Sequence, residues 1–197
     1  MPHLTLNIDM HDRTALVVGG GAVACRKVRS LLDSGADVTV VTICLNHDLA
    51  QMQTSGGVSV RIAPYETADL EGVFLAVAAT NDREVNKKIA SDARQRGILV
   101  AVADAPKSGN CTFPAILRRS DLEIAVSTGG RCPAFAVQVR DRIAGLIGAE
   151  YGAALTQLAA EREKLLTAGS SSTYNSKLVR SHAQRLMAEL TDHKEVP

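Results

Sequence analysis

The sequence predicts an α/β protein: a Rossmann-like parallel sheet domain, then a small α+β segment and a C-terminal helical segment. From Thr14 to Ala103, short apolar runs alternate with amphipathic stretches, as strands and helices alternate along a doubly wound sheet. Three glycines follow the first apolar run, where such folds bind nucleotides. The alternation stops after Pro106, and the apolar spacing beyond Pro133 is helical. We therefore expect boundaries near residues 113 and 148.

Each element follows from its own local pattern. The run at 73–79 is apolar without alternation, which is typical of a parallel strand buried on both faces. Strands are expected at 14–18, 38–42, 58–62, 73–79, 98–103 and 123–128, with a loop and a short strand across 107–115. Helices are expected at 22–34, from 81 or 82 to 96, and at 134–147, 151–166 and 174–190, with a link at 169–172 before the last one.

The composition excludes several functional classes. Of the 197 residues, 22 are Lys or Arg and 21 are Asp or Glu, so no basic surface for nucleic acid or an anionic membrane is expected. Aromatic residues make up 3% and Trp is absent, which argues against a base-stacking platform. The four cysteines form no C-x-x-C pair, and neither a signal peptide nor a membrane-spanning stretch is evident. We expect a cytoplasmic protein.

The segment Gly19–Ala24 fits the pattern G-x-G-x-x-A, directly after a predicted strand and at the start of a predicted helix. The first glycine permits the tight turn, the second lets a pyrophosphate approach the backbone, and Ala24 allows close packing of helix on strand. The helix N-terminus supplies N–H groups and a positive dipole. The pattern predicts a dinucleotide site; its alternative is a simple glycine turn. Its expected cofactor-binding residues are Gly19, Gly20, Gly21, Ala22 and Val23.

The acidic residue that usually binds the ribose about 20 residues after the glycines is absent. Thr42, Ile43 and Cys44 stand there instead, so backbone or hydroxyl contacts are expected to serve. This position alone does not decide between NAD and NADP.

Two further strand ends carry polar residues. Thr80 and Asn81 end one central strand, and Asp104 ends the next, so both ends are expected to face the nicotinamide half of the cofactor. Asp104 is a candidate proton acceptor. The alternative is that Asp104 caps a turn before Pro106.

Four motifs, VVGGGAVACRK, AATND, ADAPKSGNCTFPA and AVSTGGRCPAFA, occur in the order and spacing of a known family. Over residues 4–150 or so the chain resembles the precorrin-2 dehydrogenase/sirohydrochlorin ferrochelatase family. The resemblance implies NAD-dependent oxidation of precorrin-2 to sirohydrochlorin, and in some members insertion of Fe²⁺ to give sirohaem. It also implies a homodimer, with 1–113 as the NAD-binding domain, 114–148 as the dimerisation segment and 149–197 as a helical segment.

The resemblance also assigns residues. Asp104 matches the aspartate proposed as the family's general base, and Ala22–Val23 and Ile43–Cys44 match stretches that contact NAD. Thr128 falls where relatives have Ser or Thr near the active-site cleft, a position phosphorylated in some of them. Cys132 replaces a common Ser, which we interpret as a buried small residue.

The tetrapyrrole substrate carries eight carboxylates, so its site needs cations. The candidates are Lys107, Arg118, Arg119 and Arg131, with solvated surface cations as the alternative for each. No dedicated metal site is evident, and the macrocycle nitrogens would hold the iron.

Two other functions stay open from the residues. One is a nucleotide-sensing regulatory module without dehydrogenase activity, although such modules normally place an acid after the second strand. The other is an NADP-dependent reductase for another small molecule.

Overall fold

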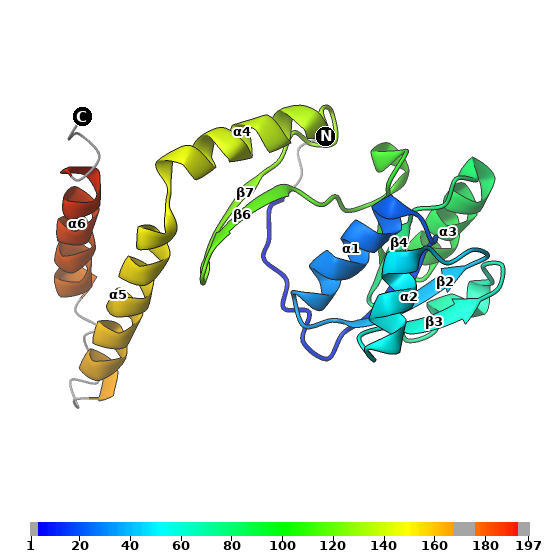
Figure 1. Ribbon diagram of the computed structural model, residues 1–197, viewed down its shortest axis with the longest axis horizontal. Helices are drawn as coiled ribbons and strands as arrows, with labels where there is room; N and C mark the ends of the chain where they lie inside the picture. Colours follow the sequence, from blue (N-terminus) through cyan, green and yellow to red (C-terminus); the bar gives the residue numbers. More distant parts are fainter. Residues whose placement is uncertain (1–3, 168–175, 193–197) are drawn as a thin grey trace. The chain divides into compact units, whose positions relative to one another are not determined.

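The computed structural model describes residues 4–167 and 176–192, in two compact units (Figure 1). The first unit ends at Phe113 and the second begins at Pro114. Each unit is described by itself. The expected further boundary near residue 148 stays a prediction.

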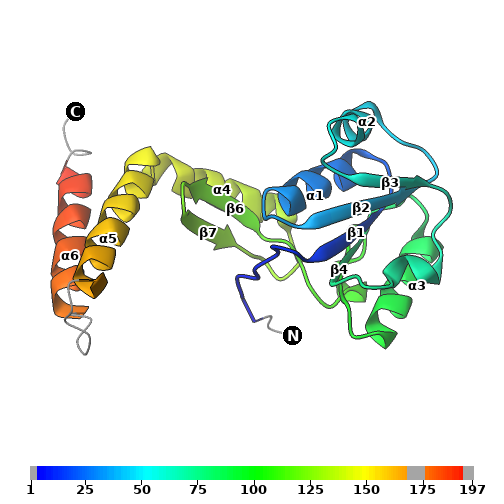
Figure 2. The same ribbon diagram turned by 90° about the horizontal axis from the view of Figure 1, so that it is seen from below.

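The first unit is a five-stranded parallel sheet in the order β3-β2-β1-β4-β5 (Figure 2). Its strands are β1 (Thr14–Val18), β2 (Asp37–Thr42), β3 (Ser59–Ile62), β4 (Leu75–Ala78) and β5 (Leu99–Val102). β4 is buried along its whole length, as the unalternating apolar run predicts. In register, Val18 lies beside Ala78 and Ala78 beside Val102, so β1, β4 and β5 end at the same level. The residues that follow these three strands therefore share one edge of the sheet.

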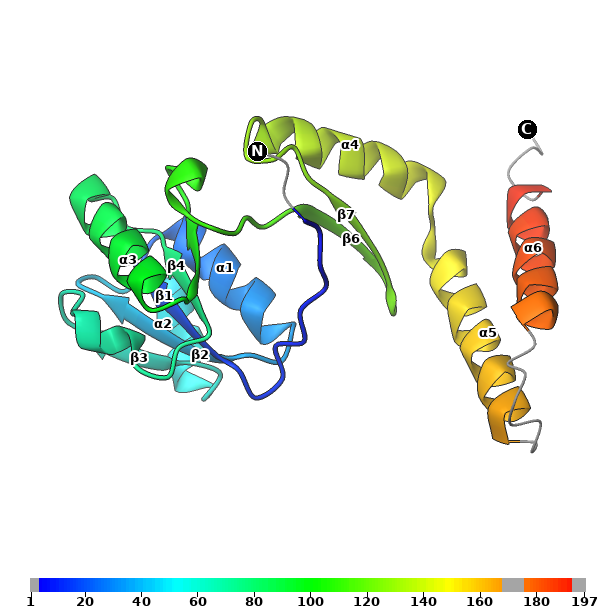
Figure 3. The ribbon, with the colours of Figure 1, turned by 180° about the vertical axis from the view of Figure 1, so that it is seen from behind.

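Helices cover both faces of this sheet (Figure 3). On one face α1 (Ala22–Leu32) and α2 (His47–Thr54) bury Val28 and Leu49 against inward side chains of β1, β2 and β4. On the other face α3 (Arg83–Gln95) buries Ile89, with the 3₁₀ turn η1 (Thr67–Leu70) beside it. This is the predicted doubly wound, Rossmann-like arrangement, and β1 and β4 lie where the order of strands reverses.

Asp92 of α3 ties η1 to the helix. Its carboxylate accepts hydrogen bonds from Tyr65 (3.1 Å), Thr67 (2.8 Å) and Lys88 (2.9 Å). Burial alone would raise the pKa of Asp92, but these hydrogen bonds outweigh it and hold the pKa below its usual range. Burial and the bond to Asp92 raise the pKa of Tyr65 well above its usual range. These hydrogen bonds stabilise the packing of η1 on α3, on the face of the sheet opposite α1.

Most predicted elements of the first unit form within two residues of their expected bounds, but α2 was not predicted. Asn46 caps it, accepting a hydrogen bond from the Leu49 N–H at 2.9 Å. Leu49 is its one buried residue, so a helix of eight residues leaves almost no periodic apolar signal.

The second unit begins with a hairpin of β6 (Ala115–Arg119) and β7 (Leu122–Val126), and the sequence did not predict β6 as a full strand. Then come α4 (Pro133–Leu146), α5 (Ala149–Thr167) and α6 (Ser176–Asp192). Helices α4 and α5 pack on the hairpin, and α5 and α6 lie side by side (Figure 3). The link predicted at 169–172 and the start of the helix predicted at 174 lie outside the described residues.

Within the described parts of the chain, no helix has both the length and the apolarity needed to cross a membrane.

Candidate active site

The glycine turn after β1 is packed against two neighbouring strand ends. Gly19 has φ +129°, and a Cβ there would lie 2.3 Å from the Ala79 carbonyl oxygen after β4. A Cβ on Gly20 would lie 1.8 Å from the Cys44 carbonyl oxygen after β2. Both positions therefore need glycine, because the backbone of the turn is wedged between the ends of β2 and β4.

Gly21 has a different environment. It is exposed, its φ is −87°, and a Cβ added to it would meet no atom within 4 Å. It is the N-cap of α1, no side chain caps the helix there, and the first turn contains no acidic residue. The first N–H groups of a helix lack intrahelical partners, and the space where a Gly21 side chain would stand is open. That arrangement fits the pyrophosphate of a dinucleotide.

After β2, where dinucleotide-binding folds usually have an acidic residue, this chain forms a hydrogen-bonded turn. The Thr42 hydroxyl donates to the Cys44 carbonyl oxygen at 2.8 Å and accepts from the Cys44 N–H at 3.2 Å. This closed turn holds the Cys44 carbonyl against Gly20, while Ile43 is 77% exposed. Thr42 thus shapes the turn through its side chain, and Ile43 presents an apolar surface. Neither residue gives a charged contact for a ribose.

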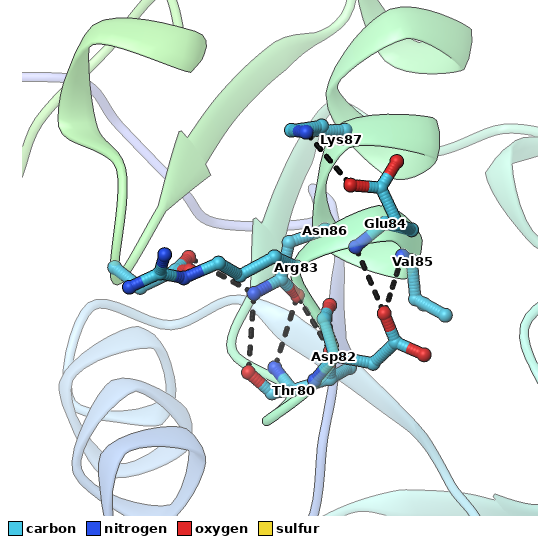
Figure 4. Close-up of polar contacts among 8 residues, drawn as sticks. Thr80, Asp82, Arg83, Glu84, Val85, Asn86 and Lys87 are labelled. Carbon is cyan, nitrogen blue, oxygen red and sulfur yellow. Dashed lines mark hydrogen bonds and ion pairs between the residues drawn. The ribbon is translucent and has the colours of Figure 1, made fainter.

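The ends of β4 and β5 are joined by a residue that the sequence did not single out, Asn86 of α3 (Figure 4). Its Oδ1 accepts from the Thr80 N–H at 3.1 Å, and the Thr80 hydroxyl lies 2.7 Å away. Its Nδ2 donates to the Thr80 carbonyl oxygen at 3.1 Å and to Asp104 Oδ1 at 2.9 Å. The sequence offers one signal for Asn86: it is a polar residue about one turn after Asp82, the N-cap of α3.

Asp104 lies in a cavity of about 330 Å³. Its side chain is 33% exposed, and Arg83 Nε lies 3.7 Å from its second oxygen, Oδ2. The cavity is lined by Arg83, Asn86, Lys87, Val102, Asp104, Ala105 and Ser108. The alternative role of Asp104 is wrong, because the turn that contains Pro106, η2 (Pro106–Ser108), has Ala105 as its N-cap and no side-chain capping bond.

Asn81 follows Thr80, and Asp82 after it caps α3 by accepting from the N–H groups of Glu84 (2.8 Å) and Val85 (3.3 Å) (Figure 4). Asn81 is exposed at the same edge of the sheet as the glycine turn. Its expected contact with the cofactor stays a prediction.

The predicted substrate cations have distinct surroundings. Lys107 is exposed on η2, directly before Ser108 of the cavity lining. Arg118 pairs across the hairpin with Glu123. Arg119 Nε donates to the Ile147 carbonyl oxygen at 2.9 Å and Nη2 to that of Ala144 at 3.3 Å, so this side chain binds the end of α4.

The last two predicted residues lie in the turn before α4. The Thr128 hydroxyl accepts from the Cys132 N–H at 3.2 Å, and Arg131 is exposed. Cys132 is exposed as well, so its interpretation as a buried residue is wrong. Arg118, Arg119, Thr128 and Arg131 belong to the second unit, and their roles toward a substrate stay predictions.

The Nζ of Lys27, a residue of α1, lies 4.0 Å from the centre of the Phe113 ring. Burial, with Arg26 nearby, lowers the pKa of Lys27. Burial raises the pKa of the neighbouring Cys111 to about 11. This thiol is therefore protonated at neutral pH and unsuited to nucleophilic chemistry.

Among the described side chains, no three His, Cys, Asp or Glu residues gather into a group that could hold a metal ion.

Comparisons with known proteins agree with this geometry. Residues 6–115 match a family described as NAD(P)-binding, and residues 119–146 match one described as "Sirohaem biosynthesis protein central". A sirohaem synthase of Methylococcus capsulatus is 42% identical over 166 residues, which is 84% of this chain and 35% of that protein. A sirohaem synthase of Methylobacillus flagellatus is 44% identical over 154 residues, 77% of this chain and 32% of that protein. The chain thus spans about a third of these relatives.

Among solved structures, a protein titled "SirC, precorrin-2 dehydrogenase" superposes with a TM-score of 0.79 at 25% identity. The match covers 96% of this chain and 100% of that one. The similarity therefore extends over both units and not over the sheet domain alone.

Proposed function

Because this chain belongs to the NAD(P)-binding family that includes precorrin-2 dehydrogenases, we propose that it oxidises precorrin-2 to sirohydrochlorin with NAD as the oxidant. The observation that carries the proposal is the row of groups along one edge of the sheet. The glycine turn, Thr80 and Asp104 follow β1, β4 and β5, which are adjacent and end at the same level. Adjacent strands are about 4.8 Å apart, so the row spans roughly 10 Å.

The reaction removes two hydrogens from precorrin-2, one as a hydride and one as a proton. When bound, NAD would supply the hydride acceptor. The chain's own contribution is to bind and to move the proton. The N–H groups at the start of α1 bind the pyrophosphate, and Gly21 keeps the space in front of them open.

The proton goes to the Asp104 carboxylate. One of its oxygens, Oδ1, is occupied by the Asn86 amide, while Oδ2 has only the Arg83 guanidinium at 3.7 Å, beyond hydrogen-bond distance. Oδ2 is thus the oxygen available to accept a proton from a bound ring. A general base of this kind contributes roughly 10²–10⁴-fold to the rate.

The carboxylates of the substrate would be bound by the cationic side chains around that cavity. Arg83 and Lys87 line it from one face of α3, and Lys107 lies on η2, directly before the lining residue Ser108. Arg83 and Lys87 were not among the cations expected from the sequence. They join Lys107 as the side chains proposed to bind the substrate's carboxylates.

The test is to incubate the chain with NAD and precorrin-2 without oxygen. NADH and sirohydrochlorin should form in a one-to-one ratio, and NADP should serve less well. Tight NAD binding without any oxidation would instead favour the regulatory module.

We also propose that the second unit forms a homodimer. An isolated two-stranded sheet is marginal in water, and this one packs on a helix that exposes Phe135 by 58% and Val137 by 40%. These side chains would be buried against a second copy. Light scattering should give a dimer, and Phe135→Glu should yield monomers that keep the fold of the sheet domain.

Insertion of Fe²⁺ into the product is proposed as a second step. It would release two pyrrole protons, of which Asp104 would accept one and the solvent the other, and the ring nitrogens would hold the iron. Formation of sirohaem from sirohydrochlorin and Fe²⁺ tests this directly. The cytoplasm is the proposed compartment, and all four cysteines are free thiols.

A further inference from the structure

Asn86 has the contacts of a residue that organises a site. It is 1% exposed, one of two buried polar residues among the described side chains. Its amide makes hydrogen bonds with both of its atoms, and all of them go to the ends of β4 and β5. A buried amide costs free energy unless every donor and acceptor is satisfied, and here they are.

The orientation of the amide is fixed by the backbone. The Thr80 N–H can only donate, so it faces Oδ1, and the Thr80 carbonyl can only accept, so it faces Nδ2. The second hydrogen of Nδ2 is therefore directed at Asp104 Oδ1. A reversed amide would place an oxygen against the carboxylate and against a carbonyl.

We propose that Asn86 is a positioning residue, which fixes the Asp104 carboxylate relative to the strand end at Thr80 so that Oδ2 faces the substrate. The inference rests on the proposed dehydrogenase function. Asn86 lines the same cavity, but the hydrogen bonds of its amide all go to Thr80 and Asp104, so its effect on the reaction passes through Asp104. It acts by holding one oxygen of the base at a fixed place relative to the strand end at Thr80.

A purely structural role is the competing explanation, and the chain offers a matched control for it. Asn110 also bridges backbone groups of β5, accepting from the Val100 N–H at 2.7 Å and donating to the Ile98 carbonyl oxygen at 3.0 Å. Among the described residues, the Asp104 carboxylate contacts Asn86 and Arg83, and Asn110 makes no hydrogen bond with it. A change at Asn110 should lower stability without altering the chemistry.

The main variant is Asn86→Asp, which keeps an oxygen toward the Thr80 N–H and replaces the donor beside Asp104 with an acceptor. Two carboxyl groups in contact cannot both ionise easily. The acidic limb of the pH–kcat profile should therefore move up by about one pH unit or more. Besides Asp104, the charged groups lining the cavity are Arg83 and Lys87, which are unchanged in this variant. Asn110→Asp should leave the limb in place.

A double-mutant cycle gives a second readout. Asn86→Ser should lower kcat roughly 10- to 100-fold, with little change in NAD affinity, because misplacing a catalytic group by about 1 Å costs on the order of 10²-fold. In the Asp104→Asn background, the same change should cost almost nothing more. Additive losses would overturn the inference.

The unaltered chain supplies a check that needs no Asn86 variant. The side-chain amide resonances of Asn86 should shift with pH along the acidic limb of activity, and Asp104→Asn should abolish that shift. An unaltered chain that does not oxidise precorrin-2 would refute the proposed function. An active chain whose profile is the same with Asn86→Asp, or whose amide does not follow Asp104, would refute the positioning role alone.

Discussion

Gly21→Ala separates the binding role of the glycine turn from its structural role. The added methyl group meets no protein atom within 4 Å, and φ of −87° suits alanine. Loss of glycine freedom in the unfolded chain favours folding by about 0.4–1 kcal/mol, and alanine is a poorer N-cap by a similar amount. The free energy of unfolding should therefore change by less than about 1 kcal/mol.

Affinity for NAD should respond strongly, because that methyl group occupies the space in front of the α1 N–H groups. Losing one hydrogen bond to a charged phosphate costs about 1.5–3 kcal/mol. Binding of NAD should weaken roughly 10- to 100-fold. Titration calorimetry measures it, and thermal unfolding without ligand verifies the fold.

Gly20→Ala is the matched control. Its methyl group would lie 1.8 Å from the Cys44 carbonyl oxygen, so the backbone after β2 must move. Such overpacking costs about 1–3 kcal/mol and should lower Tm by on the order of 5–15 °C.

If Gly21→Ala binds NAD as well as the unaltered chain does, the dinucleotide is not held at the start of α1.

Three further results are expected. Asp104→Asn should lower kcat roughly 10²–10⁴-fold while NAD still binds in calorimetry, and normal turnover would remove Asp104 as the base. Asp92→Asn should destabilise the fold by about 1–3 kcal/mol at pH 7. Since folding lowers the pKa of Asp92, this stabilisation is present above the unfolded-state pKa of about 4 and is lost as pH falls through the folded-state pKa. The stabilities of variant and parent should therefore converge in acid. Iodoacetamide at pH 8 should modify exposed Cys44 well before Cys111, whose pKa is about 11, and NAD should protect Cys44; equal rates would contradict the burial assigned to Cys111.

The parallel sheet was predictable because its central strands β1, β4 and β5 are largely apolar runs and its glycines mark a turn. β4 is buried on both faces, and Gly19 has the positive φ that the motif requires. Local patterns of this kind carry enough information for the order of elements. The same patterns hold too little information to predict α2, whose single buried residue is Leu49.

The site was only partly predictable, because its polar contacts join segments far apart in sequence. Asp104 was identifiable from its place after a strand. Asn86 was not, since its importance comes from contacts with residues 6 and 18 positions away. Arg119 was chosen by its charge and position, and the sequence could not show that its Nε and Nη2 donate to carbonyl groups at the end of α4; its role toward a substrate stays a prediction.

The most direct measurement of the central claim is a single anaerobic turnover, with precorrin-2 and NAD mixed with an excess of enzyme and the absorbance of NADH and of sirohydrochlorin followed together. Both signals should rise at one rate in the unaltered chain, and neither should rise appreciably when Asp104→Asn is mixed in the same way with its NAD site filled. Sirohydrochlorin formation at an undiminished rate by Asp104→Asn, or no NADH from the unaltered chain, would contradict a shared site for the dinucleotide and the carboxylate.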